Sequence, residues 1–537
     1  MREYCDRRWK LVGSVFVLMA TLIPLVLFVS GVSVIVVASE SVAYRYFTKV
    51  RLLAGEPGLL FLPQGQSVDA LQQLIVWVQQ SVFRIPPDSL RVRFDSFGYL
   101  TLLVNGVFTG AALLIAFTST LLRPLDKVSV GVVSLIATYG SASGISMAMM
   151  PDYYGFETSI TITALLVALA SFRRDDAIGS WSWIAAAGIL TGLALATKLT
   201  LVVIACLPMC VLLLKSRPTP AGTAARALLF GVAACVSAGF AIGAAYGFDW
   251  WRAVAAAGAW LAFVRNPGAE PNFWSSLLWP FVEGGQPGAD YIYALILVPA
   301  LTAVVLSASI QIAREKDQRG RLLLMAIARA MLAHLWALSR RPAGTTLWEL
   351  VLFWSAATGL VCALIRHERR RAQMQTIFIG IGLLVVIPSV VINAPRLLPI
   401  PVLQESTKKL WDAHAFLQRQ DGDKIVVIPD NRYAIGSVEE ILMKGVSDFP
   451  TWNITTGRRV LSDVAPGLTF RTNVDRLDSQ TTVMWIDIPG ETSLAARFPA
   501  LGIREVGTTT CQRWDIRTWE WWQRRIVICP PAPGSAS

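Results

Sequence analysis

The sequence predicts an α-helical polytopic membrane protein with about ten to twelve transmembrane helices, followed by a small extracytoplasmic α/β domain. Three observations support this fold class. Of the 537 residues, 54% are hydrophobic and only 16% are charged, and the mean hydropathy is +0.52, whereas soluble domains carry more charge. Long apolar runs recur along the chain. Beyond Pro395 the composition becomes that of an ordinary soluble domain.

The basic residues predict how the helices are oriented. The formal net charge is +12, but much of the Lys and Arg lies in short loops between apolar runs, which indicates the positive-inside rule rather than nucleic-acid binding. The first run, Leu11 to Ala38, is too long for a signal peptide and is interpreted as an uncleaved helix whose N-terminus is cytoplasmic. Further spans are expected at 98–121, 128–150, 157–172, 181–197, 199–215, 227–247, 291–313, 346–365 and 376–394.

The loops "LLRPLDK", "SFRRDD", "LKSRP" and "IAREKDQRGR" should be cytoplasmic, which places 149–157 and 197–200 outside. One segment is ambiguous. Residues 322–338 contain Arg329 and His334, so they form either an amphipathic helix on the membrane surface or one further crossing. A crossing would place the basic loop "RHERRRAQ" in the cytoplasm and the C-terminal domain outside, and would give eleven helices.

The chain divides into four parts. The transmembrane domain takes up residues 1–394, with three outer segments at 39–97, 149–157 and 248–291. Two of these segments, 39–97 and 248–291, contain aromatic-rich amphipathic stretches that are typical of the membrane interface. A Pro-rich linker is expected at 395–407, a soluble α/β domain at 408–530 and a disordered tail at 531–537.

The soluble domain is predicted from "TKKLWDAHAFLQRQ" and "SVEEILMKGV", which have helical spacing, and from "DKIVVIPDN" and "TTVMWIDIPG", which read as short buried strands. It holds two of the seven cysteines, Cys511 and Cys529, while the other five lie in or beside membrane spans. This distribution suggests a disulfide in an oxidising compartment. The alternative is a pair of free thiols.

Few patterns for catalysis are present. The three histidines are far apart in sequence, and the chain has no HExxH, no phosphate-binding GxxxxGK[ST] and no GxSxG. No nucleotide or redox cofactor is therefore expected and no metal site is assigned, although lone carboxylates could hold a divalent metal without a readable motif.

Acids and cations do gather at the predicted outer face. Glu40 follows the first helix, and Asp152 lies in "PDYYGFE" between two spans. Arg45 and Lys198 are the nearby cations expected to bind a donor phosphate, together with Tyr153 and Tyr154. A carboxylate can take a proton from an acceptor hydroxyl while cations stabilise a departing phosphate. Glu157 is assigned to the start of a helix, where it offsets the helix dipole.

The order of these features resembles the GT-C membrane glycosyltransferases, in particular the protein O-mannosyltransferase and aminoarabinose-transferase type. That family often carries "DExxY" in the outer loop after its first helix, where this chain has "SESVAYRYF". Glu40 matches the family Glu, Ser39 stands where the family has Asp, and Tyr44 falls one place late. The family's "GLAxxTKxx" hairpin is matched by "GLALATKLT", which contains Lys198.

The resemblance implies a polyprenyl-phosphate sugar donor and transfer to an extracytoplasmic glycan, lipid or protein acceptor. Because Ser39 replaces the family Asp, the base is Glu40 or Asp152, or the chain is a relative that has lost activity. The expected location is the bacterial inner membrane, with no nucleic-acid partner. Two other classes stay open, a transporter or lipid flippase and a non-catalytic membrane scaffold or sensor.

Overall fold

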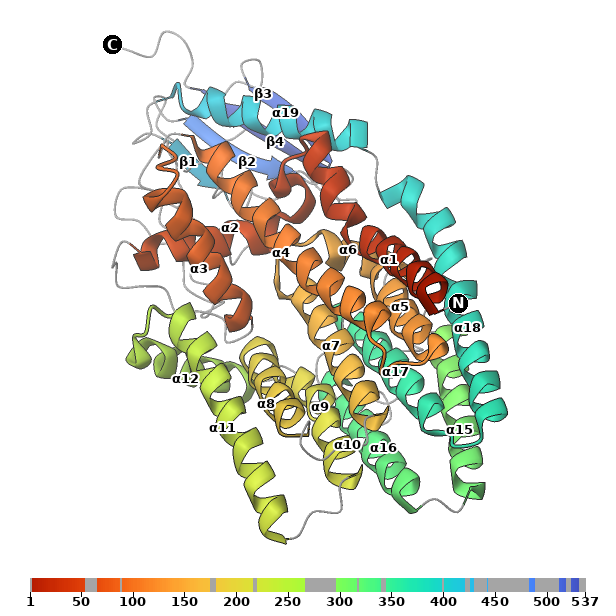
Figure 1. The fold of residues 1–537 in the computed structure, drawn as a ribbon. Helices are drawn as coiled ribbons and strands as arrows, with labels where there is room; N and C mark the ends of the chain where they lie inside the picture. The colour runs from red at the N-terminus through yellow and green to blue at the C-terminus, as the bar shows by residue number, and fades with distance from the viewer. Residues whose placement is uncertain are drawn as a thin grey trace, which may run out of the picture.

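The computed structural model describes residues 2–53, 65–86, 89–173, 180–215, 220–265, 296–315, 318–339, 344–397, 400–420, 425–428, 442, 482–487, 511–517 and 523–530. A bundle of helices carries one further helix and a small sheet at one end (Figure 1). The first helices are α1 (Arg2–Ser30), α2 (Val34–Leu53), α3 (Gln66–Ser81), α4 (Leu90–Thr118), α5 (Pro124–Tyr139), α6 (Ala142–Met149), α7 (Tyr153–Arg173) and α8 (Ser180–Thr197). Next come η1 (Leu199–Leu201), α9 (Val202–Ala205), α10 (Leu207–Lys215), α11 (Pro220–Ala245), α12 (Trp250–Arg265), α15 (Val298–Arg314), α16 (Gln318–Ser339), α17 (Gly344–Leu364), α18 (Glu368–Leu397) and α19 (Ile400–Leu417).

The bundle has the composition of a membrane protein. Within the described ranges, five helices are long and apolar enough to cross a bilayer: Arg8–Ser30, Leu90–Thr118, Tyr153–Ser171, Ala221–Ala245 and Glu368–Ile392. Shorter apolar helices occupy Trp181–Thr197, Leu199–Leu212, Val298–Arg314 and Trp348–Leu364. The chain is therefore an α-helical membrane protein with a small C-terminal α/β part, as the sequence predicts.

The first apolar run does not form one helix up to residue 38, because it is broken at Gly31. That glycine adopts a left-handed φ of 65°, a conformation that commonly ends a helix. The Asp95 carboxylate of α4 accepts hydrogen bonds from the Ser33 hydroxyl at 2.6 Å and from the first amide of α2 at 3.0 Å. We call residues 31–33 the elbow. Glu40 thus belongs to helix α2 rather than to a loop, and its side chain lies outside the described residues.

The two ends of the bundle differ in charge. At one end, which we call the basic end, Arg366 and His367 donate their amides to Glu315 at 2.8 and 2.9 Å, and Arg370 donates to Gln311 at 3.0 Å. Trp9 of α1 lies there too, with the Lys127 ammonium 5.7 Å from its ring centre. We call the opposite end, where α6 meets α7 and α8 meets η1, the site end.

Helix α16 joins these two ends, which bears on the ambiguous segment 322–338. Arg321, near its start, donates to the Ala313 carbonyl at the basic end. His334, near its finish, lies 3.3 Å from the Glu349 carboxylate at the site end. Helix α16 packs against α17 and α10 along the bundle, but it is not among the described helices that are apolar enough to cross a membrane, so the crossing stays a prediction.

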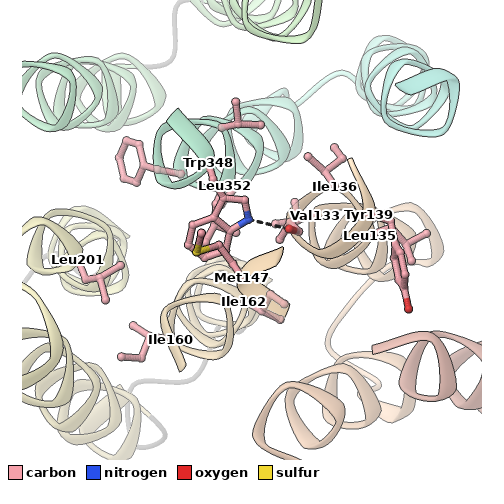
Figure 2. Packing of buried hydrophobic residues seen from close by; sticks show 14 of the residues in the cluster. Val133, Leu135, Ile136, Tyr139, Met147, Ile160, Ile162, Leu201, Trp348 and Leu352 are labelled. Carbon is pink, nitrogen blue, oxygen red and sulfur yellow. Dashed lines mark hydrogen bonds between the residues drawn. The ribbon is translucent and has the colours of Figure 1, made fainter. Parts of the chain in front are cut away.

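The core of the bundle is anchored by Trp348 at the start of α17. Its indole N–H donates to the Ala137 carbonyl of α5 at 2.7 Å, and the ring lies among Val133, Met147 and Leu352 (Figure 2). A buried indole needs such a partner for its N–H. This anchor fixes the direction of the next residue of α17, Glu349.

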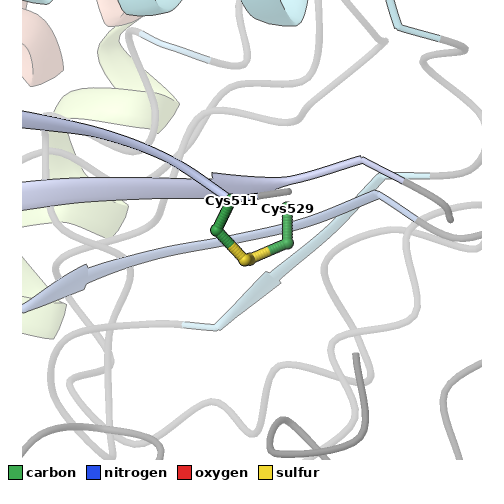
Figure 3. Close-up of a disulfide and its surroundings, with 2 residues drawn as sticks. All are labelled: Cys511 and Cys529. Atoms are coloured by element: carbon green, nitrogen blue, oxygen red, sulfur yellow. A yellow bond between two sulfur atoms is a disulfide. The ribbon is translucent and has the colours of Figure 1, made fainter. Parts of the chain in front are cut away.

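The C-terminal part combines α19 with four strands, β1 (Ile425–Ile428), β2 (Thr482–Asp487), β3 (Gln512–Arg517) and β4 (Gln523–Cys529). Their order is β1-β2-β4-β3, with β1 parallel to β2 and the other two pairs antiparallel. The structure joins Cys511 and Cys529 in a disulfide at the edge of this sheet (Figure 3). Helix α19 packs on β3 and also contacts the bundle through Thr407, whose hydroxyl accepts the Ser33 amide of the elbow at 2.9 Å.

The expected linker 395–407 is mostly helical, because α18 continues to Leu397 and α19 begins at Ile400. The proline at position 401 falls in the first turn of α19, where the missing N–H leaves no hydrogen bond unmade. The expected span 128–150 is divided between α5 and α6 around Gly140, and the expected span 199–215 between η1, α9 and α10. The predicted tail 531–537, the second half of 248–291 and almost all of "SVEEILMKGV" lie outside the described residues.

Candidate active site

Four charged side chains meet at the site end where α2, α3 and the start of α7 come together. One guanidinium nitrogen of Arg45 lies 2.8 Å from Asp69, and another lies 2.7 Å from Asp152. The Lys49 ammonium also lies 2.8 Å from Asp69. Arg45 therefore bridges two carboxylates, which suits the planar fork of a guanidinium. We call these four residues the α2 cluster.

All four members of the α2 cluster are buried, so each charge is stabilised by its partners rather than by water. Burial raises the pKa of Asp152, and the adjacent Arg45 opposes that shift. Burial lowers the pKa of Lys49, and Asp69 opposes that shift. Removing any one charge would leave a buried partner uncompensated, which typically costs about 3–5 kcal/mol.

A second charged group surrounds Lys198, in the turn between α8 and η1. Its ammonium contacts the carboxylate of Glu349, on α17, and lies 3.4 Å from that of Glu157, on α7. Thr200 also donates a hydrogen bond to Glu349. Burial alone would lower the pKa of Lys198, but the two carboxylates outweigh it and raise that pKa, so Lys198 is a cation. Lys198, Glu157, Glu349 and His334 form the Lys198 cluster.

Two tyrosines connect the clusters. The Tyr153 ring lies 5.3 Å from the Arg45 guanidinium and 5.8 Å from the Lys198 ammonium. Tyr154 also lies 5.8 Å from Lys198, and its hydroxyl accepts a hydrogen bond from that of Tyr153 at 3.2 Å. Cations over aromatic faces are attracted by the ring quadrupole. The two clusters therefore form one continuous polar layer.

Backbone contacts hold this layer together from several elements. Gly65, just before α3, donates its amide to the Thr197 carbonyl beside Lys198 at 2.6 Å. Asn105 of α4 donates to the Asp152 carbonyl at 3.0 Å, and Gln72 of α3 donates to the Pro151 carbonyl at 3.1 Å. The turn that carries Asp152 is thus fixed by α3 and α4.

The "GLALATKLT" motif has a clear structural role in this arrangement. At Gly192 a side chain would collide with Ser237 and the backbone of α11, and at Gly188 a Cβ would lie 2.6 Å from the Phe230 carbonyl oxygen. Small residues allow such close helix packing in membranes. The α8–α11 contact in turn sets the position of Lys198 at the end of α8.

The structure brings together five of the six residues that the sequence predicts for chemistry or donor binding: Arg45, Asp152, Tyr153, Tyr154 and Lys198. The side chain of the sixth, Glu40, is outside the described residues.

The assignment of Glu157 to a helix start needs correction, because this residue is an ionic partner of Lys198. Glu157 is the fifth residue of α7, just beyond the first turn of the helix, and only the fold shows its ionic partner. The roles of all these residues stay predictions.

Sequence reasoning missed Asp69, Glu349 and His334 as members of the site. Glu349 had a readable signal, because it is an isolated acid inside the apolar run "LWELVLFW", and such residues in membrane segments are usually functional. Asp69 lies in an amphipathic stretch, where a single acid is ordinary, so the sequence did not mark it as a site residue.

If every carboxyl is ionised, the layer is negative overall, with three cations (Arg45, Lys49, Lys198) against four acids (Asp69, Asp152, Glu157, Glu349). Neither carboxylate oxygen of Glu157 makes a hydrogen bond within the described part of the chain. Among the described residues, no group of three or more His, Cys, Asp or Glu side chains is gathered so as to hold a metal ion. A narrow cavity of about 40 Å³ reaches the layer at Tyr154, between Asn105 and Trp348.

Comparison with known proteins finds similarity in structure only. No family model and no curated protein matches the chain. The structure of ArnT from Cupriavidus metallidurans bound to undecaprenyl phosphate is 13% identical, covers 98% of each chain and has a TM-score of 0.48. The same protein in the apo state is 12% identical over 94% of this chain and 97% of that chain, with a TM-score of 0.45.

The archaeal oligosaccharyltransferase AglB from Archaeoglobus fulgidus, in complex with an inhibitory peptide and a dolichol-phosphate, is 12% identical. It covers 82% of this chain and 60% of that chain, with a TM-score of 0.41. Both proteins are GT-C superfamily members, the type that the sequence resembles. At these identities and TM-scores the likeness concerns arrangement alone, so the chemistry proposed for this chain rests on its own residues.

Proposed function

We propose that the chain is a membrane glycosyltransferase that moves a sugar from a polyprenyl-phosphate donor to an extracytoplasmic acceptor. The observation that carries the proposal is the buried polar layer at the site end. In it, three cations suited to a lipid phosphate lie beside a carboxyl group whose pKa is raised.

Asp152 is the residue we propose as the general base. Burial raises its pKa, and a carboxylate with a raised pKa is a stronger base. In the proposed step Asp152 takes the proton of the acceptor hydroxyl, and the acceptor oxygen forms a bond to the anomeric carbon. The bond from that carbon to the phosphate oxygen breaks, and its electron pair stays on the departing phosphate.

Arg45 and Lys198 are proposed to stabilise the phosphate that departs. Arg45 is held by Asp152 at 2.7 Å before the reaction. Protonation of Asp152 removes the negative charge beside Arg45, so the guanidinium can then balance the charge that develops on the phosphate. Proton transfer and phosphate departure would thus assist each other. Protonation of Asp152 would also remove one negative charge from a layer that holds four acids and three cations before the reaction.

A transporter or flippase is supported less well. Transporters commonly place charged residues near the middle of the membrane, at broken helices. Here Glu157 is in the second turn of α7 and Glu349 in the second turn of α17, so the charges gather at one end of the described bundle. This location suits a reaction at the membrane face.

The test replaces Asp152 by Asn in the full chain, reconstituted in lipid nanodiscs with polyprenyl-phosphate sugars and an extract of envelope acceptors. The release of polyprenyl phosphate is measured, because every donor of this class yields it. Asp152→Asn should lower the rate by about 100-fold or more, since general bases contribute about 10²–10⁴. Glu40→Gln is measured in parallel to decide between the two predicted bases.

Asp412→Asn is the matched control, since it removes an exposed carboxylate of α19 outside the layer. It should leave the rate unchanged. A wild-type rate in both Asp152→Asn and Glu40→Gln would reject the assignment of the base. Movement of the lipid between leaflets without release of polyprenyl phosphate would favour the flippase.

A further inference from the structure

We propose that Glu349 is a positioning residue of the donor site, which fixes the Lys198 ammonium in place for the phosphate of the donor. In this role Glu349 touches neither donor nor acceptor and acts through Lys198. The inference rests on the proposed function, because it names the residue that prepares one of the two cations assigned to the departing phosphate.

The two carboxylate oxygens of Glu349 have different partners. Oε2 contacts the Lys198 ammonium. Oε1 accepts a hydrogen bond from the Thr200 hydroxyl and lies 3.3 Å from Nε2 of His334. An ionised carboxylate can only accept hydrogen bonds, so Nε2 carries the proton in this contact. Thr200 and His334 thus hold one oxygen, and the other oxygen faces Lys198.

The segment of α17 that carries Glu349 is fixed as well. The preceding residue, Trp348, donates its indole N–H to the Ala137 carbonyl at 2.7 Å. His334 packs on Phe353, four residues further along α17, with ring centres 4.4 Å apart. Glu349 itself is 1% exposed, so water does not compete for its oxygens. Helices α5, α16 and α17 together therefore determine where this carboxylate lies.

The Lys198 ammonium keeps donors for a ligand. An ammonium has three N–H donors, and within the described part of the chain it makes one hydrogen bond, to Glu349. The Glu157 carboxylate lies 3.4 Å away and makes no hydrogen bond with it. Tyr154, whose ring lies 5.8 Å from the ammonium, lines the narrow cavity that reaches the layer. An ammonium fixed by Glu349 thus has donors left for a phosphate beside Tyr154.

The depth of the pair argues against a purely structural role. Apolar residues can often replace a buried ion pair without loss of stability, and acids in apolar membrane segments are costly and commonly functional. Burial lowers the pKa of Lys198, whereas Glu157 and Glu349 raise it, so that the pKa stays above the ordinary 10.5. Loss of Glu349 would remove one of the two carboxylates that keep this amine protonated.

Other titratable groups also face the Lys198 ammonium. Tyr153 and Tyr154 approach it from α7, as Glu157 does, and Asp152 interacts with it electrostatically from just before α7. The role of Glu349 must therefore be measured by changing Glu349 alone, with all these groups in place.

The test measures the protonation of Lys198 by competitive amine labelling with acetic anhydride at about pH 9. The full chain is labelled in nanodiscs and analysed by mass spectrometry. Only the neutral amine reacts, so at a pH below the pKa the rate rises about tenfold for each unit by which the pKa falls. A nearby opposite charge typically changes a pKa by about 1 to 3, so Glu349→Gln should raise the labelling rate of Lys198 about tenfold or more.

Two further variants make the measurement specific. Glu349→Asp keeps the charge on a side chain one carbon shorter and should give a rate between the wild type and Glu349→Gln, so it decides the question if Glu349→Gln does not fold. Glu405→Gln is the matched control, because it removes the partner of Lys409, 2.7 Å away on the exposed face of α19. It should leave Lys198 unchanged and alter the rate of Lys409 by about threefold or less, since water and salt screen exposed pairs.

Release of polyprenyl phosphate is then followed across neutral and alkaline pH in the same variants. If Glu349 serves the reaction through Lys198, the loss of activity at high pH should begin at a lower pH in Glu349→Gln than in the wild type. Lys198→Arg combined with Glu349→Gln should abolish this difference, because a guanidinium stays charged over the whole range.

An unchanged labelling rate in Glu349→Gln would overturn the inference, whether or not the chain is a transferase. A raised labelling rate with a wild-type pH dependence of release would show that the reaction does not use the charge of Lys198, which overturns the positioning role and leaves the transferase activity standing. A wild-type chain that releases no polyprenyl phosphate would reject the proposed function itself, and the labelling would then report an ion pair alone.

Discussion

Gly65 shows how much of the site depends on a residue that has no side chain. It adopts a left-handed φ of 90°, and an added Cβ would lie 3.0 Å from the Tyr153 ring and 3.1 Å from the Arg45 guanidinium. Its amide meanwhile donates to Thr197. One backbone position thus contacts the α2 cluster, the tyrosines and the turn that carries Lys198.

Gly65→Ala should therefore damage both stability and activity. The left-handed backbone would cost about 1–2 kcal/mol of unfolding free energy, and the methyl group would press on Arg45 and Tyr153. Thermal unfolding in nanodiscs and release of polyprenyl phosphate are the two measurements. Gly239→Ala is the control, because it lies within α11 with open space around it. Equal behaviour of the two variants would contradict the proposed contact.

At the same scale, the sequence could name site residues but not their partners. "PDYYGFE" and "GLALATKLT" indicated Asp152, Tyr153, Tyr154 and Lys198, because acids, tyrosines and a lysine at predicted helix ends are unusual there. Which carboxylate faces which cation depends on helix packing across more than a hundred residues, as Lys198 and Glu349 show. A single sequence carries no direct record of such pairs.

Among the elements, the junction of α1 and α2 controls where the α2 cluster lies. Hydropathy alone predicts one long helix here, since Gly31 sits in an otherwise unbroken apolar run. The structure instead turns the chain at Gly31 and starts α2 against Asp95. Arg45 and Lys49 both lie on α2, so the direction of that helix places both cations.

Asp95→Ala should lower the free energy of unfolding by about 1 kcal/mol, as loss of a helix cap typically does. It should also weaken binding of polyprenyl phosphate, because α2 loses its anchor at the end nearest the elbow. Asp249→Ala removes a comparable cap, on the amide of Arg252 at the start of α12, and should cost stability alone. Wild-type binding in Asp95→Ala would show that the elbow does not position the cluster.

Helix α19 contains a buried histidine that should make the C-terminal part sensitive to acid. His414 donates through Nδ1 to the Leu442 carbonyl at 3.0 Å, and burial lowers its pKa below the ordinary 6.5. As pH falls through 6.5, the unfolded chain takes up a proton that the folded chain does not. The free energy of unfolding must then fall, by up to about 1.4 kcal/mol per unit of pKa difference.

Melting of the full chain at pH 8 and pH 5.5 would measure this effect. His414→Gln keeps an N–H donor for Leu442 and should flatten the dependence on pH. His367→Gln, at the exposed basic end, should leave the dependence as it is in the wild type. An unchanged slope in His414→Gln would assign the acid sensitivity to other groups.

For the whole molecule, the two ends of the described bundle differ, and the predicted orientation in the membrane depends on that difference. The start of α1, the α4–α5 turn, the end of α15 and the start of α18 meet at the basic end. The polar layer lies at the site end, and α18 leads to α19 there (Figure 1). The helices and the difference between the two ends could be predicted from hydropathy and charge. Strands β3 and β4 were not predicted, because polar residues interrupt the apolar pattern by which a strand is recognised.

We therefore expect the N-terminus in the cytoplasm and the C-terminal part outside. A reporter that is active only in the cytoplasm should be active when fused before Met1 and silent when fused after Ser537. Activity of both fusions would contradict an uneven number of crossings.

The contact between Ser33 and Thr407 joins residues 374 positions apart in the chain. During synthesis the first two helices emerge long before α19. The contact between the elbow and Thr407 can therefore form only after most of the protein has been made and inserted. Contacts of such long range form late, because closing a large loop is entropically unfavourable. Helix α19, which is made late in synthesis, thus completes the support for the α2 cluster, and a truncated chain that ends before α19 would lack it.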